Sequence, residues 1–290
     1  MTRAVTIGQF SHSPVLAAAE HLGLLAHIDL EIITKKVLSS PGQYEWLRDG
    51  DIDIAITSPD NVLLYATTEK NPISEQLDIT MLRAIDRGLG LSLVTRPDLD
   101  LTNPETSIRM GVDVMKSGFA FLLRSMLTSL GVTPGQLEFT EVGSTPTRKG
   151  LLLAGEIDGT ILNAESVVEA GAAGMRVWSS SADISENYLG TVIAVGPGFD
   201  PQLAADFVQV WAEATEWLLD APAADVSAAL GKVDPRLGTP EYLEILRNPL
   251  TGLLRDPEIS INQLQILCDI REASDAYVPA KAHLERLATG

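Results

Sequence analysis

Cysteine is almost absent from this sequence, which excludes proteins built on disulfides or on clustered thiols. Cys268 is the only cysteine among 290 residues, so neither a disulfide framework nor a thiolate zinc site can form within the chain. It lies in the apolar stretch "INQLQILCDI", where a buried structural thiol is expected. No Walker, G-x-S-x-G or H-E-x-x-H sequence is present. We therefore expect neither a metal site nor a cofactor.

Positive charge is also scarce. The chain has 21 Lys and Arg against 39 Asp and Glu, a formal net charge of −18. Proteins that bind nucleic acid need clustered cations to meet the phosphate backbone, so we expect no nucleic-acid partner. The acidity otherwise indicates solubility, and it does not by itself predict a cationic ligand.

Long apolar runs are missing as well. No stretch reaches the ~18 uncharged apolar residues of a membrane span, so we expect no membrane insertion. A secretory signal needs a basic start and then an unbroken apolar run, whereas "VLAAAEHLGLLAHI" is interrupted by Glu20, His21 and His27. We therefore predict a cytoplasmic protein, or an extracytoplasmic one if a leader peptide has been removed.

A repeated pattern dominates what is present. "LRDGDIDIAIT" (47–57) returns as "LLAGEIDGTIL" (152–162), and strands alternate with helices in the same order around both copies. Gly8 and Gly111 are 103 positions apart, Ser13 and Ser117 are 104 apart, and Gly50 and Gly155 are 105 apart. Serine before a helix and glycine after one are the usual end residues. The alternation and the near-constant spacing predict an α/β protein with two similar lobes.

Two β-rich segments are expected to connect these lobes. "LSLVTRPDLDLTNPETS" (91–107) reads as a crossover strand and linker, and "YLGTVIAVGPGF" (188–199) as a second crossover that returns the chain. A helical tail follows, starting with Asp200 before Pro201. We predict a first lobe of residues 1–95, completed by 190–290, and a second lobe of residues 96–189.

The order and spacing of these segments resemble a known family over the whole chain. "GQFSHSPVLAAAEHLGLL", "LRDGDIDIAITSPDN" and "GVDVMKSGFAFLLRSMLTSLGV…VGSTPTRKGLLLAGEIDGTIL" are similar to type II periplasmic-binding-protein-like chains, in particular the alkanesulfonate, taurine and pyrimidine-precursor (SsuA/ThiY/NMT1-like) solute-binding proteins. The resemblance implies a two-lobed fold with two crossover connections and an interlobe cleft. It also implies an ABC permease as a partner if the protein is exported.

Ligands of open α/β sheets bind at the carboxyl ends of strands, which points to six loops. The candidate ligand contacts are Ser11, His12, Ser13, Gln43, Tyr44, Ser58, Asp60, Asn61, Lys116, Ser117, Gly118, Phe119, Gly143, Ser144, Thr145, Asn163 and Glu165. Helix starts at Ser13 and Ser117 offer free N–H groups to an anion. Ser117 is the better candidate, because Gly118 lets a ligand approach the backbone and Lys116 adds positive charge.

His12 is the one histidine in such a loop, and three roles remain open for it: general base, ligand contact, or ordinary polar residue. Arg148 opens a helix, where a cation opposes the dipole, so it is either an anion contact or a solvated side chain. Arg87 is a second cation of interest and can simply pair with Asp86. Glu165 is a candidate acid or hydrogen-bond acceptor.

Two functions follow from this reading. The first is binding of a small organic anion, carboxylate- or sulfonate-like, between two closing lobes, as in ABC-transporter solute-binding proteins. The second is a cytoplasmic enzyme on the same fold, a decarboxylase, lyase or hydrolase acting on a small carboxylate or ring compound with His12 as general base. Fold alone does not decide between them.

Overall fold

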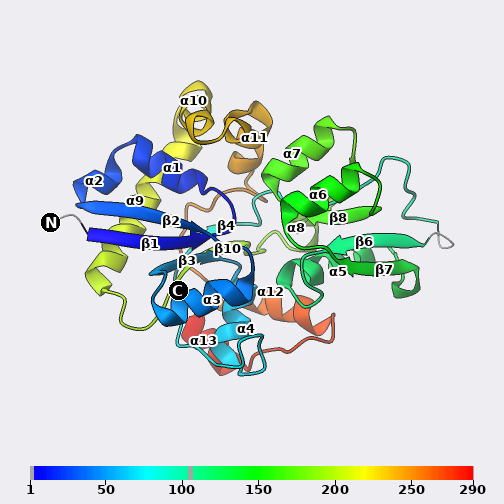
Figure 1. The fold of residues 1–290 in the computed structure, drawn as a ribbon, viewed down its shortest axis with the longest axis horizontal. Helices are drawn as coiled ribbons and strands as arrows, with labels where there is room; N and C mark the ends of the chain where they lie inside the picture. Colours follow the sequence, from blue (N-terminus) through cyan, green and yellow to red (C-terminus); the bar gives the residue numbers. More distant parts are fainter. Residues whose placement is uncertain (1–2, 104–106, 290) are drawn as a thin grey trace.

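Two separate five-stranded sheets, each covered by helices, form the two lobes of the molecule (Figure 1). The computed structural model describes residues 3–103 and 107–289, so residues 104–106 of the expected linker lie outside it. The first lobe contains β1 (Arg3–Gln9), α1 (Pro14–His21), α2 (Leu24–His27), β2 (Leu30–Lys36), α3 (Ser40–Asp49), β3 (Ile54–Thr57), α4 (Pro59–Thr67), β4 (Thr80–Asp86), β10 (Thr191–Val195), α9 (Pro201–Asp220), α10 (Ala223–Val233), the 3-10 helix η2 (Pro235–Gly238), α11 (Pro240–Arg247), α12 (Ile261–Glu272) and α13 (Lys281–Leu287). The second lobe contains β5 (Ser92–Thr95), β6 (Ile108–Val112), α5 (Gly118–Ser129), the 3-10 helix η1 (Pro134–Gln136), β7 (Leu137–Glu141), α6 (Thr145–Leu153), β8 (Gly159–Leu162), α7 (Ala164–Ala172), β9 (Arg176–Ser180) and α8 (Ser181–Ile184).

The two sheets share one topology. Their strand orders are β2-β1-β3-β10-β4 and β7-β6-β8-β5-β9. In each, the first three strands of the repeat are parallel, and a strand that comes from the other half of the chain inserts antiparallel beside them. The two-lobed α/β fold is therefore confirmed, with one copy of the repeat in each lobe.

The helix ends follow the residues that predicted them. The Ser13 hydroxyl accepts a hydrogen bond from the Leu16 N–H at 3.3 Å, and Ser117 accepts one from Ala120 at 3.1 Å. Each serine thereby satisfies a free N–H in the first turn of its helix, α1 or α5. Gly50 ends α3 with φ of 76°, a left-handed conformation that suits glycine.

Glycine and isoleucine of the repeat make the same close contact in both lobes. A Cβ on Gly8 would lie 2.7 Å from Cδ1 of Ile52, and one on Gly111 would lie 2.6 Å from Cδ1 of Ile157. Both isoleucines are buried. The isoleucine of each Gly-acid-Ile-Asp stretch therefore packs directly over a glycine of the first strand, which leaves no room for a side chain there.

The aspartate of the same stretch holds the first strand. The Asp53 carboxylate accepts the backbone N–H of Thr6 at 2.7 Å, and Asp158 accepts that of Arg109 at 2.8 Å. Two equivalent packing contacts and two equivalent hydrogen bonds explain why the Gly-acid-Ile-Asp pattern occurs twice in the sequence.

The two crossovers touch each other between the lobes. A Cβ on Gly190 would collide with the backbone of Gly88, and the buried Asp86 side chain accepts the Gly88 N–H at 2.8 Å. One division needs correction: Ser92–Thr95 pairs antiparallel with β8 and β9, so the range 1–95 runs four residues into the second sheet. The chain therefore crosses between the lobes before Ser92, and Ser92–Thr95 belong to the second lobe.

The lobes also share a hydrophobic core. Helix α12 lies between α4 and α5 (Figure 1) and packs against α5 of the second lobe. Its Leu264, Leu267 and Cys268 are buried in one cluster with Phe121 and Met126 of α5. The expected burial of Cys268 is confirmed.

Candidate functional site

At the strand ends of the first lobe, Gln43 of α3 joins two strands, β1 and β3. Its Nε2 donates to the carbonyl oxygens of Gly8 at 3.0 Å and Ile56 at 3.1 Å. Because both N–H groups are used, the amide orientation is fixed and the buried Oε1 has no protein partner. Beside it, the Tyr44 ring stacks on Tyr65 with centroids 4.0 Å apart, and burial raises the pKa of the Tyr44 hydroxyl.

Arg148 takes the equivalent place in the second lobe, 105 positions after Gln43. Its Nη1 donates to the carbonyl of Gly143 at 2.6 Å, and its Nη2 donates to Thr145 Oγ1 at 3.0 Å and Ile161 O at 3.3 Å. The side chain is 2% exposed, and this burial lowers its pKa. Arg148 is therefore not a solvated side chain; its Nη groups bind the protein's own oxygens and brace the strand ends.

Asp60 and Gly118 bring the two lobes into direct contact. A Cβ on Gly118 would lie 2.6 Å from Cβ of Asp60 and 2.8 Å from its Oδ2. Both carboxylate oxygens of Asp60 accept from Nη1 of Arg271, at 2.8 and 2.7 Å, and these two side chains are 5% and 2% exposed. Burial raises the pKa of Asp60, against the lowering effect of the Arg271 charge. We call Asp60, Arg271 and Gly118 the inner end of the lobe contact.

A second, more open charged group lies between the lobes around Glu165. Its Oε2 is 3.6 Å from Nη2 of Arg236, which also binds Asp234. Burial raises the pKa of Glu165, while the charges of Arg236 and His12 lower it, so His12 lies within electrostatic reach of this carboxylate. His12 is exposed, and the Arg236 side chain is 44% exposed. We call His12, Glu165, Asp234 and Arg236 the outer mouth.

The inner end and the outer mouth are related by the repeat. Asp60 and Glu165 are 105 positions apart, and each is the second residue of the helix after the third strand of its copy. Asp60 lies against the start of α5 in the other lobe, and Glu165 lies 3.6 Å from Arg236 of η2 in the other lobe. Each is paired with an arginine from the C-terminal part of the chain. One design thus occurs twice, buried at one place and open at the other.

Sequence reasoning missed both arginines. Arg271 is a charge on the otherwise apolar buried face of helix α12, and that position was the available signal. Arg236 lies in η2 with no sequence signal of its own.

The other predicted contacts lie in helix starts and loops, where several polar groups are already hydrogen-bonded within the protein. Ser58 caps α4 through the Asp60 N–H, Asn61 donates to Thr57, Ser117 donates to Asp113, and Ser144 hydrogen-bonds Thr147. Ser11 and Lys116 are exposed, and Phe119 packs at the edge of the core.

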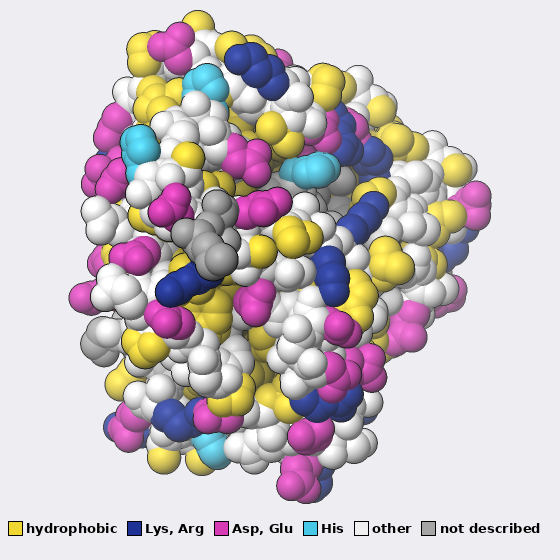
Figure 2. All heavy atoms as spheres, turned by 60° about the vertical axis from the view of Figure 1, so that its left-hand side comes forward, with side chains coloured by type: hydrophobic (Ala, Val, Ile, Leu, Met, Phe, Trp, Pro, Cys, Tyr) yellow, Lys and Arg dark blue, Asp and Glu magenta, His cyan; other side chains and the backbone are white. Residues whose placement is uncertain are grey.

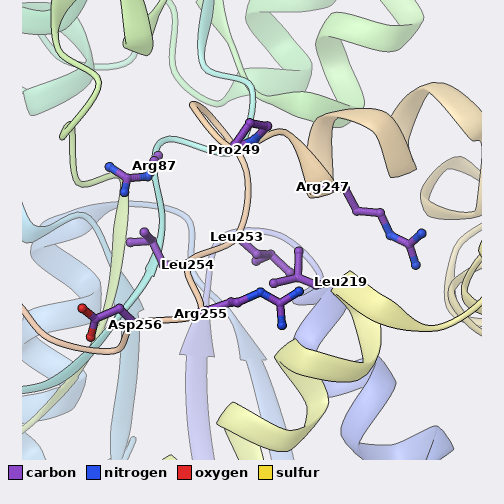
Figure 3. A pocket seen from close by; sticks show the side chains of 8 residues that line it. All are labelled: Arg87, Leu219, Arg247, Pro249, Leu253, Leu254, Arg255 and Asp256. Carbon is purple, nitrogen blue, oxygen red and sulfur yellow. The ribbon is translucent and has the colours of Figure 1, made fainter.

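Arg87 lies on the crossovers and not at the outer mouth. It donates to the Glu186 carbonyl at 2.5 Å and to Asn187 Oδ1 at 3.3 Å, so it ties the two crossovers together. A pocket of about 390 Å³ adjoins it, and Figure 3 shows that Arg87 points away from the other two arginines there, Arg247 and Arg255. These cations do not converge on one point, and the pocket is therefore a weak candidate for an anion site.

The described residues hold no ready site for a metal ion and no membrane-spanning helix. Over 3–103 and 107–289, no three His, Cys, Asp or Glu side chains are grouped to bind a metal. In the same ranges, every helix is too short or too polar to cross a bilayer. In the space-filling view, acidic side chains are spread over the face, while Lys and Arg gather on its right half beside a hollow (Figure 2).

Comparison with known families identifies the chain. The model of the NMT1-like family matches residues 2–231, more than half of the sequence. The chain belongs to the NMT1-like family. No curated protein matches the sequence.

Solved structures share the fold of this NMT1-like chain at low identity. The ligand-binding component of an ABC-type import system from Staphylococcus aureus, with zinc bound, has a TM-score of 0.77 and 14% identity, covering 97% of this chain and 95% of its own. The alkanesulfonate-binding protein SsuA from Xanthomonas axonopodis pv. citri, bound to MOPS, has a TM-score of 0.72 and 16% identity. The match covers 96% of this chain and 95% of SsuA. The CA3427 gene product of Candida albicans, with the generic periplasmic binding protein fold, has a TM-score of 0.70 and 14% identity. The match covers 99% of this chain and 94% of the Candida protein. The NMT1-like chain therefore has the two-lobed periplasmic binding protein fold.

Proposed function

We propose that this NMT1-like chain binds a small organic anion, a carboxylate or sulfonate, between its two lobes. The observation that carries the proposal is the outer mouth, where Glu165 of the second lobe lies 3.6 Å from the half-exposed Arg236 of the first. The similarity to an alkanesulfonate-binding protein supports a ligand of this class. The predicted loops of both lobes provide the remaining contacts in this proposal.

The chemistry of the outer mouth suits an acid with a hydrogen-bond donor. Asp234 binds the Nε–Nη2 edge of the Arg236 guanidinium, and the remaining Nη1–Nη2 edge matches the two oxygens of a carboxylate or sulfonate. Ser13 begins α1 nearby, and a helix start favours negative charge. Glu165, partly buried and held by cations, offers an acceptor for an N–H or O–H of the ligand.

His12 keeps the second function open as an alternative. It lies within electrostatic reach of two carboxylates, Glu165 and Asp234. A histidine near carboxylates can serve as a general base. The alternative function is therefore an enzyme that takes a proton from a small carboxylate through His12.

One experiment separates binding from catalysis. Wild type, His12→Ala and Arg236→Gln are titrated calorimetrically with MOPS, taurine, succinate and benzoate, and consumption of each binder is then followed. For a binding protein, His12→Ala weakens affinity by ~1–2 kcal/mol, roughly five- to thirtyfold. Arg236→Gln weakens it roughly ten- to a hundredfold, because a charged hydrogen bond is lost. For an enzyme, His12→Ala lowers turnover by ~10²–10⁴-fold and largely keeps binding.

Arg255→Gln is the matched control. Arg255 is an exposed arginine paired with Asp220 at the crossover pocket, away from the outer mouth. It leaves affinity unchanged if the proposal is right. Equal effects of both arginine variants, or none from His12→Ala and Arg236→Gln, contradict the proposal.

The partner and the location follow from the binding role. One structural neighbour is a component of an ABC-type import system, and we extend the proposal to an ABC permease as partner wherever the chain is exported. The cytoplasmic location expected from the sequence gains no support from neighbours described as periplasmic or import proteins, and it stays a prediction.

A further inference from the structure

The inner end of the lobe contact already contains a carboxylate. Asp60 of α4 lies against Gly118, the first residue of α5 in the other lobe, so close that a Cβ on Gly118 would be 2.7 Å from the carboxyl carbon. A ligand acid bound at the start of α5, as predicted from Ser117 and Gly118, would need this same space. The protein has placed one of its own acids there.

Arg271 holds that carboxylate and is itself held by other groups. Its Nη1 donates to both oxygens of Asp60, and its Nε donates to the carbonyl of Tyr277 at 2.6 Å. The guanidinium also lies 5.4 Å from the ring centre of Phe121 in α5. Because these contacts do not involve Asp60, the cation stays in place when the carboxylate is removed.

The equivalent pair at the outer mouth is arranged differently. Glu165 is 3.6 Å from Arg236, too far for a strong hydrogen bond, and Arg236 is 44% exposed against 2% for Arg271. Asp234 binds the Nε–Nη2 edge of Arg236. A ligand acid reaches the remaining Nη1–Nη2 edge, 3.6 Å or more from Glu165 and Glu169, without breaking a pair as buried as Asp60 and Arg271. At the inner end it would have to displace a desolvated carboxylate bound by two hydrogen bonds.

We infer that Asp60 is a built-in substitute for a ligand acid: it neutralises Arg271, fills the space beside Gly118, and confines the acid of the ligand to the outer mouth. Asp60 is thereby a specificity-determining residue of this NMT1-like chain. The inference about confinement rests on the proposed function. The statement that the inner end is an occupied carboxylate site does not.

The test is chemical rescue of Asp60→Gly by formate. This variant opens the space of the side chain and leaves the buried cation of Arg271 without a partner, which strongly destabilises a fold. Formate supplies the missing group. At formate concentrations about 20 times its dissociation constant, the folding equilibrium constant rises about twentyfold by mass action. We measure thermal midpoints in formate and, at equal ionic strength, in chloride.

Two controls make the result specific. Wild type has no vacancy, and Asp220→Gly removes an exposed acid paired with Arg255; both respond equally to formate and chloride. If Asp60→Gly does not fold in chloride, recovery of folded protein on refolding in formate is measured instead. No formate-specific gain in midpoint or in recovery overturns the inference.

The double variant Asp60→Gly/Arg271→Met identifies the cation responsible, and it loses the formate response. A double variant that still responds overturns the role of Arg271. None of these measurements needs the ligand. Failure of the outer mouth to bind any acid would therefore end the proposed function and leave the rescue result standing.

Discussion

Gly118→Ala tests how tightly the lobes are held together. The change adds one methyl group at the first position of α5, where the backbone φ lies outside the left-handed region and alanine is allowed. Helix propensity by itself favours alanine over glycine. Any loss of stability must therefore come from the surroundings of the new Cβ.

Those surroundings leave no space. The methyl carbon would lie 2.6 to 2.8 Å from three atoms of Asp60, whose carboxylate is fixed by two hydrogen bonds to Arg271. Overpacking of this kind costs ~1–3 kcal/mol. The lobes can also relieve it by moving apart, which increases the radius of gyration.

Gly150→Ala is the matched control. Gly150 lies within α6, and a Cβ there meets no atom within 4 Å. Gly150→Ala raises the free energy of unfolding by about 0.5–1 kcal/mol through helix propensity and leaves the lobes in place. Urea denaturation and small-angle X-ray scattering on both variants and wild type measure the two effects. If Gly118→Ala is as stable as Gly150→Ala with an unchanged radius of gyration, the close approach at the inner end is wrong.

The remaining predictions concern buried polar groups. Gln43→Leu leaves the carbonyls of Gly8 and Ile56 without donors and lowers the free energy of unfolding in urea by ~1–3 kcal/mol; an unchanged value refutes the bracing role of Gln43. Burial raises the pKa of Asp86 to about 6. The native state then keeps a proton that the unfolded chain has lost, so wild-type stability falls as pH rises from ~4 to ~6. Asp86→Asn removes this fall, so at pH 7 its free energy of unfolding exceeds that of wild type by at most about 3 kcal/mol relative to their difference at pH 4. If the free energies of unfolding of the two proteins change in parallel with pH, the prediction is wrong.

The fold was predictable because its signals are local. Ser13 and Ser117 cap their helices through an N–H three residues later, and Gly50 ends a helix by its own conformation. The repeat adds a second, independent copy of the same signals. Periodicity and end residues of this kind are written within a few positions of the element they define.

The charged groups between the lobes were only half predictable. Asp60 and Glu165 follow strands, so the strand-end rule finds them. Their arginines do not follow any rule, since Asp60 and Arg271 are 211 positions apart and no local pattern connects them. Arg148 shows the same limit: its position at a helix start was correct, but only packing shows that it is buried.

Helix α12 has a consequence for how the chain is made. Its Leu264, Leu267 and Cys268 pack in one cluster with apolar residues of α5, more than a hundred positions earlier in the sequence. During synthesis, α5 is translated long before α12, so the apolar face of α5 that packs against α12 stays uncovered until then. We therefore expect the second lobe to complete its packing only after α12 is translated, and a chain that ends before α12 to leave this face of α5 uncovered.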